Sequence, residues 1–339
     1  MAPGHGGYER FVRPILFSLE PETAHDVAIA ALRAASHFDF ARRVLKRFAP
    51  TPNPSTVFGI TFPNPIGLAA GFDKNGVAVP AWGALGFGFI EIGTITARAQ
   101  AGNPKPRIFR CSETLALINR LGFNNDGADA IAGRLAKLRA RGRWPPLPIG
   151  VNIGKSRETP LGEATQDYLY CFHKLHPFAD YIALNISSPN TPGLRSLQDR
   201  QLLSPLLREI QQANAEIRKP ILIKIAPDLS ESQLSEMIAV CEQNQVAGII
   251  ATNTTTDHSA IPAPVNQEGG LSGAPLHEKS TELVRAIRAR STIPVIGCGG
   301  IMDAASALEK FAAGAQLLQV YTGYVYRGPS LLREITNQL

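Results

Sequence analysis

The chain has 339 residues, of which 44% are hydrophobic and 18% charged, a composition typical of a globular protein with a large core. Lysine and arginine outnumber aspartate and glutamate by 34 to 28, so the formal net charge is +6. No basic block and no basic run interleaved with aromatic residues accompanies this excess, which argues against nucleic acid as a partner. The positive charge is therefore expected to serve anionic small molecules or an anionic membrane surface.

The four cysteines, Cys111, Cys171, Cys241 and Cys298, form no short-spaced pair. This spacing argues against zinc, iron–sulfur and disulfide frameworks, and we expect no metal site. Dispersed single thiols suit a reducing cytoplasm. The N-terminus has neither an 18-residue apolar run nor a signal-peptide pattern, so we expect a chain that does not span a membrane and is not exported by that route.

The first fifty residues predict three short helices. One begins near Tyr8, a second begins at Pro21, and a third covers about Phe38–Phe48 with a basic character. Two interpretations stay open for their apolar stripes: a cap packed on the main domain, or a monotopic element that lies in a lipid interface with its cations on the headgroups. Prolines at 50, 52 and 54 predict a stiff linker into the next domain, which divides the chain into segments 1–50 and 51–339.

From residue 55 onward, short apolar runs alternate with helical patterns, which indicates a parallel sheet whose strands are joined by helices. Eight such runs predict a (β/α)8 barrel. An open doubly wound sheet is the alternative, but no G-x-G-x-x-G follows the first run, which argues against a dinucleotide-binding Rossmann domain. The predicted strands are Ile66–Ala69, Phe89–Ile92, Pro148–Val151, Tyr181–Leu184, Ile221–Ile225, Gly248–Ala251, Pro294–Ile296 and Gln316–Val320.

Polar or small residues follow every predicted strand, at the end where barrel enzymes place their active sites. The run Asn185–Arg195 is the richest of these ends, because two prolines and a glycine hold small polar side chains on a constrained loop. Gly299-Gly300 and Thr322-Gly323 follow the last two strands, where barrels bind phosphate. Lys224 lies within an apolar strand, either in a salt bridge at the barrel mouth or facing a cofactor that becomes negative, as a flavin does on reduction.

Taken together, these motifs resemble the dihydroorotate dehydrogenases of the membrane-associated, quinone-dependent class, over essentially the whole predicted barrel. The resemblance implies a (β/α)8 barrel that binds one FMN and oxidises dihydroorotate to orotate in pyrimidine synthesis, with a quinone as electron acceptor. The matching motifs are Leu68–Lys74, Glu91–Thr96, Gly102–Arg107, Ile118–Asn125, Asn185–Arg195, Lys224–Asp228, Ala251–Thr255, Gly270–Gly273 and Tyr321–Gly323.

The same resemblance assigns expected roles to individual residues. The expected FMN contacts are Ala70, Gly71, Phe72, Asp73, Lys74, Thr94, Asn152, Asn185, Lys224, Thr252, Gly273, Gly300, Tyr321 and Thr322. The expected substrate contacts are Lys74, Asn119, Arg120, Leu121, Gly122, Phe123, Asn185, Asn190, Asn253 and Thr254, with the loop from Asn119 to Phe123 closing over the substrate ring.

Ser188 resembles the catalytic base of the quinone-dependent class, whereas the soluble classes carry Cys at that position. A free serine is a poor base, so its position, a neighbouring threonine or water, and exclusion of solvent must assist it. By the same resemblance, His25, Arg110 and Tyr321 line the route of the quinone to the flavin. The expected protein is then a monomer bound peripherally to the cytoplasmic face of the cell membrane.

Two alternatives remain open at this stage. One is a soluble relative that uses fumarate or NAD, and Ser188 together with the N-terminal helices argues against it. The other is a non-enzymatic flavin-binding or scaffold protein that kept the fold. Loss of the base or of Lys74 would have indicated that outcome, and both residues are present.

Overall fold

The computed structural model describes residues 7–339, so the first six residues of the predicted segment 1–50 lie outside the described part. Eight parallel strands form a closed barrel, which rules out the open doubly wound sheet. Every predicted strand is present within one to three residues of its expected limits. In the order in which they pair, the strands are β3 (Ile66–Leu68), β4 (Phe89–Ile95), β7 (Ile149–Ile153), β8 (Tyr181–Asn185), β9 (Ile221–Ile225), β10 (Gly248–Ala251), β12 (Val295–Cys298) and β13 (Leu317–Val320), which pairs again with β3.

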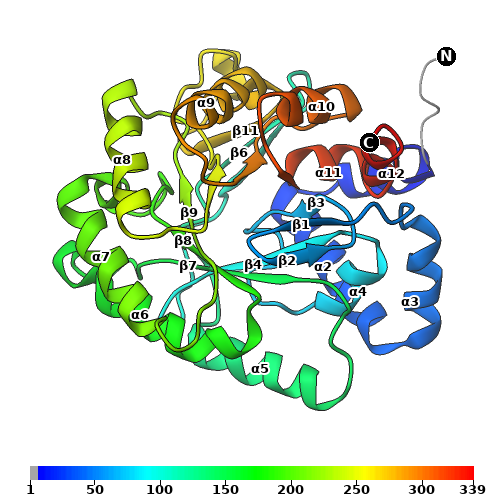
Figure 1. Cartoon of the computed structure of the whole chain (residues 1–339). Coiled ribbons are helices and arrows are strands. Elements are labelled where there is room, and N and C mark those ends of the chain that lie inside the picture. The colour runs from blue at the N-terminus through cyan, green and yellow to red at the C-terminus, as the bar shows by residue number, and fades with distance from the viewer. Residues whose placement is uncertain (1–6) are drawn as a thin grey trace.

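Helices surround the barrel and bury the outward side chains of its strands (Figure 1). Because both faces of each strand are covered, the strands are buried along their whole length and read as continuous apolar runs in the sequence. The helices are α4 (Val79–Ala84), α5 (Ala128–Ala140), α6 (Ala164–Leu175), α7 (Arg200–Ala213), α8 (Glu231–Gln243), α9 (His277–Arg290), α10 (Ala304–Ala312), α11 (Thr322–Arg327) and α12 (Ser330–Thr336).

A hairpin of β1 (Ser55–Val57) and β2 (Ile60–Phe62) stands next to the amino ends of the barrel strands. Phe62 is fully buried and packs edge-to-face on Phe89, which in turn contacts Tyr181 inside the barrel. This aromatic layer belongs to a second core cluster, separate from the one between barrel and helices. The amino end of the barrel is therefore filled with side chains, and only the carboxyl end is open to a ligand.

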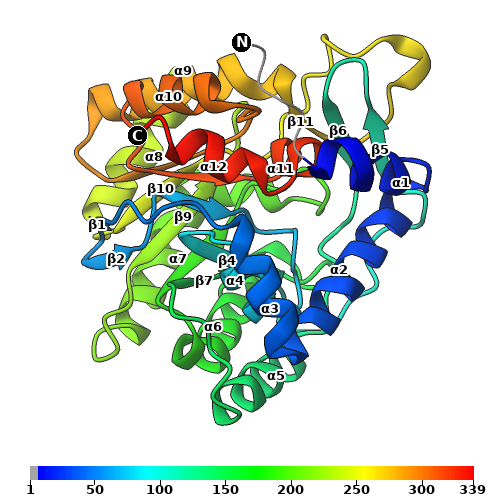
Figure 2. The same cartoon turned by 90° about the vertical axis from the view of Figure 1, so that its right-hand side faces the viewer.

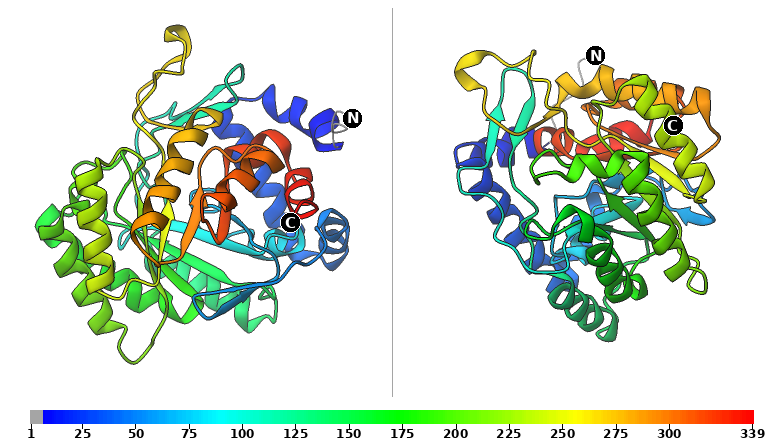
Figure 3. Two further views of the ribbon diagram at one scale, coloured as in Figure 1. Left: turned by 45° about the horizontal axis from the view of Figure 1, so that its top comes forward. Right: turned by 90° about the vertical axis from the view of Figure 1, so that its left-hand side faces the viewer.

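A second small sheet, absent from the sequence prediction, stands at the carboxyl end. It consists of β5 (Ile108–Cys111), β6 (Ala116–Asn119) and β11 (Gly270–Gly273), with β6 in the middle. Strand β6 pairs with β11 although about 150 residues separate them in the sequence, as the register of Asn119 with Gly270 shows. Hairpin β5–β6 and the chain before β11 extend side by side beyond the barrel (Figure 3).

The N-terminal helices α1 (Arg13–Phe17), α2 (Pro21–His37) and α3 (Asp39–Leu45) lie along one side of the barrel (Figure 2). Helix α2 packs Ile29 and Leu32 against the core, so part of the apolar stripe is a cap, as one interpretation held. Other apolar side chains point outward, including Ile15, which is 68% exposed, and Phe40, which is 74% exposed. No helix within residues 7–339 is both long and apolar enough to cross a bilayer.

A buried ion pair joins α2 to the barrel. Arg107 donates two hydrogen bonds of 3.1 and 2.8 Å to Glu22 Oε1, and its other nitrogen donates to the carbonyl oxygens of Ala101 and Asn103. Burial alone would raise the pKa of Glu22, but hydrogen bonds and charge from Arg107 and Lys105 outweigh it and hold this pKa below its ordinary value. Glu22 is therefore an anion at neutral pH, and its charge helps to fix the orientation of α2.

Candidate active site

A cavity of about 130 Å³ occupies the carboxyl end of the barrel, beneath the three-stranded sheet. Every barrel strand except β7 contributes to its wall, directly or through the loop that follows. Its lining consists of Ala69, Ala70, Gly71, Lys74, Thr94, Asn119, Leu121, Gly122, Phe123, Asn185, Ser188, Asn190, Lys224, Thr252, Asn253, Thr254, Ser272, Gly273, Leu276, Cys298, Gly299, Gly300, Ile301, Gln319, Val320, Tyr321, Thr322 and Gly323.

The floor of the cavity is a hydrogen-bonded row of polar side chains from neighbouring strands. Asn185 donates to Thr94 at 2.8 Å, and Thr94 donates to Asn152 at 2.6 Å. Asn152 in turn donates to the buried carboxylate of Glu91 at 2.8 Å. Asn152, an expected FMN contact, does not line the cavity; it lies behind the wall, where its oxygen accepts from Thr94 and its nitrogen donates to Glu91.

Lys224 is a buried cation in this wall without a protein partner. It is 5% exposed, lines the cavity, and makes no hydrogen bond or ion pair with any residue in 7–339. Gln319 lies in the same wall, and its side-chain oxygen is buried without a hydrogen-bond partner. Because buried charges and buried polar atoms are rarely left unpaired, Lys224 indicates a ligand with a hydrogen-bond acceptor or negative character, and the Gln319 oxygen indicates a hydrogen-bond donor on that ligand.

Glycines form the part of the cavity next to β12 and β13. A Cβ atom on Gly300 would lie 2.1 Å from the Cα of His277, and one on Gly273 would lie 2.3 Å from the carbonyl oxygen of Leu115. Both residues also have positive φ values, +70° and +98°, which other residues rarely adopt. The close approach leaves backbone N–H groups at the cavity surface, which is how such a cradle binds phosphate.

The loop after β8 brings Ser188 to the opposite side of the cavity. Ser188 is 6% exposed, and its hydroxyl accepts a hydrogen bond of 3.3 Å from the backbone N–H of Asn190. The Asn190 side chain donates to the carbonyl oxygen of Asn119 at 3.0 Å, which links this loop to the end of β6. Asn253 donates to Asn185 at 3.3 Å and to the hydroxyl of Ser187 at 3.0 Å.

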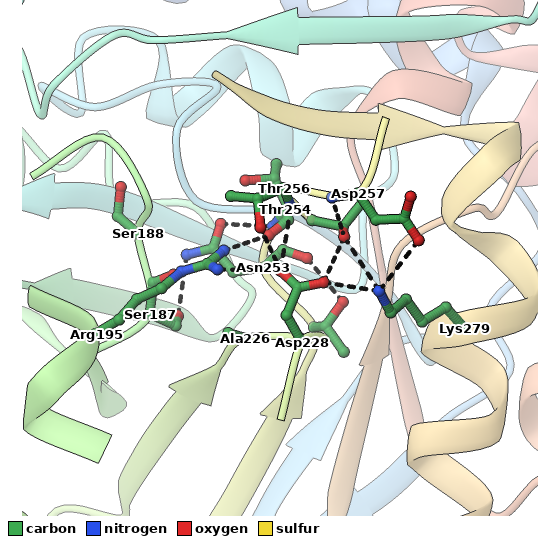
Figure 4. Close-up of polar contacts among 12 residues, drawn as sticks. Ser187, Ser188, Arg195, Ala226, Asp228, Asn253, Thr254, Thr256, Asp257 and Lys279 are labelled. Carbon is green, nitrogen blue, oxygen red and sulfur yellow. Dashed lines mark hydrogen bonds and ion pairs between the residues drawn. The ribbon is translucent and has the colours of Figure 1, made fainter. Parts of the chain in front are cut away.

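An ion-pair cluster outside the cavity supports the Ser188 loop (Figure 4). Arg195 donates to the carbonyl oxygens of Ser187 at 3.2 Å and Thr254 at 3.1 Å, and pairs with Asp228 at 3.0 Å. Lys279 from α9 pairs with the other oxygen of Asp228 at 2.8 Å. The guanidinium of Arg195 thus joins the backbone on either side of the cavity, next to Ser188 and at Thr254.

A smaller cavity of about 110 Å³ lies between α2 and the barrel. Lys74 and Leu121 line both this cavity and the main one, so the two spaces adjoin at these residues. The ring of Phe72 lies between His25, at 5.5 Å, and Tyr321, at 4.9 Å. Burial lowers the pKa of His25 to about 3, so its imidazole is neutral, and burial together with Arg107 lowers the pKa of Lys74 to about 8.

Besides Asn152 and His25, described above, four of the residues named from the sequence do not line the main cavity. Asp73 accepts hydrogen bonds from the N–H groups of Val77 and Ala78 and from Trp82, so its side chain fixes the loop and is directed away from the cavity. Phe72 lines only the smaller cavity. Arg120 points outward and donates to the carbonyl oxygen of Pro106.

Arg110 is the fourth of these residues. It lies over the ring of Phe17 at 4.0 Å and donates to the Phe17 carbonyl oxygen at 3.0 Å, at the end of α1. It lines neither cavity. Its Nε atom is buried without a hydrogen-bond partner among the described residues.

Sequence reasoning missed several groups that complete the site. Glu91 interrupts an apolar strand in the same way as Lys224 does, which was a usable signal, and it accepts hydrogen bonds from Asn152, Tyr181 and Gln319. The Arg195 and Asp228 pair spans 33 residues of sequence and leaves no local pattern.

The chain forms a closed (β/α)8 barrel, and one cavity brings together a glycine cradle, an unpaired cation and a polar loop. This combination is typical of barrel enzymes that bind a phosphate-bearing cofactor at the carboxyl ends of their strands. Within that class, the dihydroorotate dehydrogenase family profile matches residues 54–339. The chain belongs to the dihydroorotate dehydrogenase family.

Similar proteins support this assignment over nearly the full length. The chain is 49% identical over 334 residues to a dihydroorotate dehydrogenase (quinone) of Gloeobacter violaceus, covering 97% of this chain and 93% of the relative. It is 51% identical over 333 residues to one from Stenotrophomonas maltophilia, covering 95% and 93%. A crystal structure of DHODH from Eimeria tenella in complex with ferulenol superposes with a TM-score of 0.82 at 34% identity, covering 95% and 93%.

Proposed function

We propose that this protein oxidises dihydroorotate to orotate in pyrimidine biosynthesis and passes the electrons through FMN, one per chain, to a quinone. The family profile and the relatives named dihydroorotate dehydrogenase (quinone) support the reaction and the acceptor. The observation that carries the proposal is the unpaired buried Lys224, which lines the same cavity as Ser188 and the glycine cradle.

The residues of the cavity fit FMN. Gly273, Gly300 and Thr322 would hold its phosphate, while Asn185, Lys224 and Thr94 would contact its ring, with Asn152 acting from behind. A bound flavin supplies the acceptor for a hydride. Because Lys224 has no carboxylate partner, its charge is available to an electron-rich ring that gains negative charge.

The substrate would lie on the side of the cavity formed by the Ser188 loop and the end of β6. Lys74 would bind its carboxylate, since a pKa of about 8 leaves this lysine mainly protonated at neutral pH. The amides of Asn119, Asn190 and Asn253 supply donors and acceptors for the ring.

Ser188 is proposed to take the proton from C5 of the substrate as a hydride leaves C6. The hydroxyl proton of Ser188 has to leave as the C5 proton arrives, because the oxygen would otherwise carry two protons and a positive charge, and an alkoxide formed beforehand would be costly in a buried site. Thr191, three residues further along the same loop, has a buried hydroxyl without a hydrogen-bond partner among the described residues. This hydroxyl is a candidate to relay the proton, either directly or through a water molecule.

The quinone is proposed to approach through the smaller cavity beside α2. Its wall includes His25, Phe72 and Lys74, and the Phe72 ring links His25 to Tyr321 at the edge of the main cavity. Arg110 would act at the α1 end. The exposed apolar side chains of the N-terminal helices support a peripheral, membrane-bound protein at the cytoplasmic face of the cell membrane. We further propose that residues 1–50 form a membrane and quinone unit, that residues 51–339 form the catalytic barrel, and that the protein is a monomer.

The first experiment is an anaerobic mixture of the purified protein with dihydroorotate, in which the yellow flavin band is followed. The proposal predicts bleaching, then recovery of colour when a short-chain quinone is added and no recovery with NAD or fumarate. Recovery with NAD or fumarate would leave the substrate assignment standing and contradict the acceptor. A yellow protein that never bleaches would contradict the reaction itself.

Replacement Ser188→Ala tests the base. The variant should keep its flavin, because Ser188 touches only the Asn190 N–H, and its bleaching rate should fall by a factor of about 10² to 10⁴. Ser188→Cys is the matched variant, since a thiol can also take a proton, and it should restore part of the rate at high pH. Equal bleaching rates for Ser188→Ala and the wild type would remove Ser188 from this role.

A further inference from the structure

Lys310, on α10, is a second buried cation without a counter-ion. It is fully buried, and its ammonium group donates to the hydroxyls of Ser280 at 2.6 Å and Thr281 at 2.8 Å on α9. No ion pair joins it to a carboxylate within residues 7–339. Its neighbour Glu309 is directed outward and pairs with His277 at 2.8 Å. A charge buried against neutral hydroxyls alone is costly, so another source of negative charge is expected nearby.

The contacts of Ser280 lead from Lys310 to the cavity. Ser280 accepts the hydrogen bond from Lys310, and its one hydroxyl hydrogen is within reach of two carbonyl oxygens: Gly299 at 2.9 Å, the shorter contact, and His277 at 3.1 Å. The peptide bond between Gly299 and Gly300 is trans, so its N–H points opposite to its carbonyl. With the carbonyl held on the α9 side, the Gly300 N–H is turned away from Ser280, which lies outside the cavity lining that Gly299 and Gly300 form.

The local packing is built around this arrangement. A Cβ atom on Gly297 would lie 2.7 Å from Cδ of Lys310, so the glycine in β12 makes room for the lysine stem to pass. The N–H of Gly300 makes no hydrogen bond with the described part of the chain. The buried N–H of Gly300, on the cavity side, is therefore connected to the buried ammonium group of Lys310 through the hydrogen bonds of Ser280.

We propose that Lys310 is a positioning residue for the cofactor phosphate: through Ser280 it orients the Gly299–Gly300 peptide toward the phosphate, and its buried charge adds attraction for that anion. The inference rests on the proposed FMN cofactor and goes beyond it, because Lys310 touches neither the cavity nor any bound group. Burial lowers the pKa of Lys310 to about 8, and at neutral pH the ammonium form remains dominant.

Lys155 provides the matched comparison, because it is also a buried lysine. It is 2% exposed and donates to the backbone carbonyl oxygens of Ser156 at 2.9 Å and Thr159 at 2.7 Å. It does not line the cavity, and none of the residues that accept its hydrogen bonds does. Replacing either lysine by methionine removes a buried charge of the same kind, but only one of the two charges lies behind the phosphate cradle.

The experiment compares FMN with riboflavin, which has the same ring system and no phosphate. Flavin-free wild type, Lys310→Met, Lys155→Met and Ser280→Ala are titrated with each compound, and binding is followed by quenching of flavin fluorescence. Thermal unfolding of each flavin-free protein is recorded in parallel. We expect Lys310→Met to weaken FMN binding by at least about tenfold while riboflavin binding stays within about twofold, since only FMN carries the charge that Lys310 attracts.

Ser280→Ala should weaken FMN in the same selective way but less, and Lys155→Met should change the ratio of the two affinities little. Equal weakening of FMN and riboflavin by Lys310→Met would mean a general packing defect and would overturn the inference, as would unchanged FMN binding. A wild type that binds neither compound would overturn the proposed cofactor, and the inference with it. A Lys310→Met protein that fails to fold leaves the decision to Ser280→Ala, whose unselective or absent effect would equally overturn it.

Discussion

Arg195 illustrates what a single side chain does for the geometry of this site. Its planar fork contacts two backbone carbonyls and one carboxylate that belong to three different loops. Asp228, its partner, is shared with Lys279. Burial alone would raise the pKa of Asp228, but hydrogen bonds from Lys279, Thr255 and the Thr256 N–H outweigh it and lower this pKa. The cluster therefore stays charged over the neutral range and holds the Ser188 loop without touching the cavity.

Replacement Arg195→Met should slow dihydroorotate-dependent bleaching by about tenfold or more, because a small displacement of reacting groups costs a large part of the rate. Arg195→Lys should recover only part of the bleaching rate, because a single ammonium group cannot donate to the two carbonyl oxygens and the carboxylate at once as the planar guanidinium does. The readout is the bleaching rate at saturating substrate, together with flavin content. Lys279→Met is the control, since it removes a partner of Asp228 but no contact to the loop, and its effect should be smaller. An equal loss from both variants would assign the effect to Asp228 instead.

At the scale of elements, the buried ion pair of Glu22 with Arg107 attaches α2 to the barrel. Since the folded-state pKa of Glu22 lies below its unfolded value, the pair contributes stability that is fully present above the unfolded value of about 4.3 and is lost as pH falls through the folded value. Acid should therefore release α2 before it unfolds the barrel, whose strands contain few ionisable groups.

Glu22→Gln should reproduce this release at neutral pH, with a loss of about 3 kcal/mol or more, because an unpaired Arg107 remains buried. Hydrogen exchange of the α2 amides, recorded from pH 7 down to pH 3, measures it. Asp39→Asn is the matched control: Asp39 pairs with Arg42 at the surface of α3, so its removal should cost less than about 1 kcal/mol. Slow exchange in Glu22→Gln at pH 7, equal to wild type, would contradict this role.

Elements also mark the limit of what the sequence predicts. The eight barrel strands were predicted because a strand buried on both faces leaves an unbroken apolar run. The sheet of β5, β6 and β11 was not, because its strands are only four residues long and β11 pairs with a partner about 150 residues away. Most residues named from the sequence at the strand ends line the cavity, whereas the side chain of Asp73 caps its own loop and does not line it.

At the scale of the whole molecule, apolar side chains are exposed mainly at one place. Phe11, Ile15, Phe38, Phe40 and Phe48 on or beside α1 and α3 are each at least 45% exposed. Such a set on basic, amphipathic helices fits attachment to a lipid surface, because burying each phenylalanine gains roughly 1.5–3 kcal/mol. The barrel opens its cavity toward the β6 and β11 sheet, and the smaller cavity opens beside α2.

The double replacement Phe38→Ser and Phe40→Ser should weaken binding to anionic vesicles by at least about tenfold, since each side chain adds more than one factor of ten when buried. Bleaching by dihydroorotate should not change, because neither residue lines a cavity. Vesicle flotation measures the binding to lipid, and flavin absorbance measures the bleaching. Val265→Ser removes an apolar side chain that is 46% exposed on the chain before β11, outside the N-terminal helices, and it should leave vesicle binding as it is. Loss of vesicle binding in that control would indicate non-specific hydrophobic association instead of attachment through the N-terminal helices.

Hydrogen bonds join the N-terminal helical segment to α11, near the C-terminus. Tyr8 donates to the carbonyl oxygen of Val325 at 2.8 Å, and Arg13 donates to that of Tyr326 at 3.2 Å. During synthesis the N-terminal helices leave the ribosome first, and α11, their attachment point, is made almost last. The barrel itself closes only when β13 reaches β3, so the glycine cradle forms at the same late moment. For most of translation, the core-facing side chains of α2, among them Ile29 and Leu32, therefore lack the finished barrel against which they pack in the folded protein.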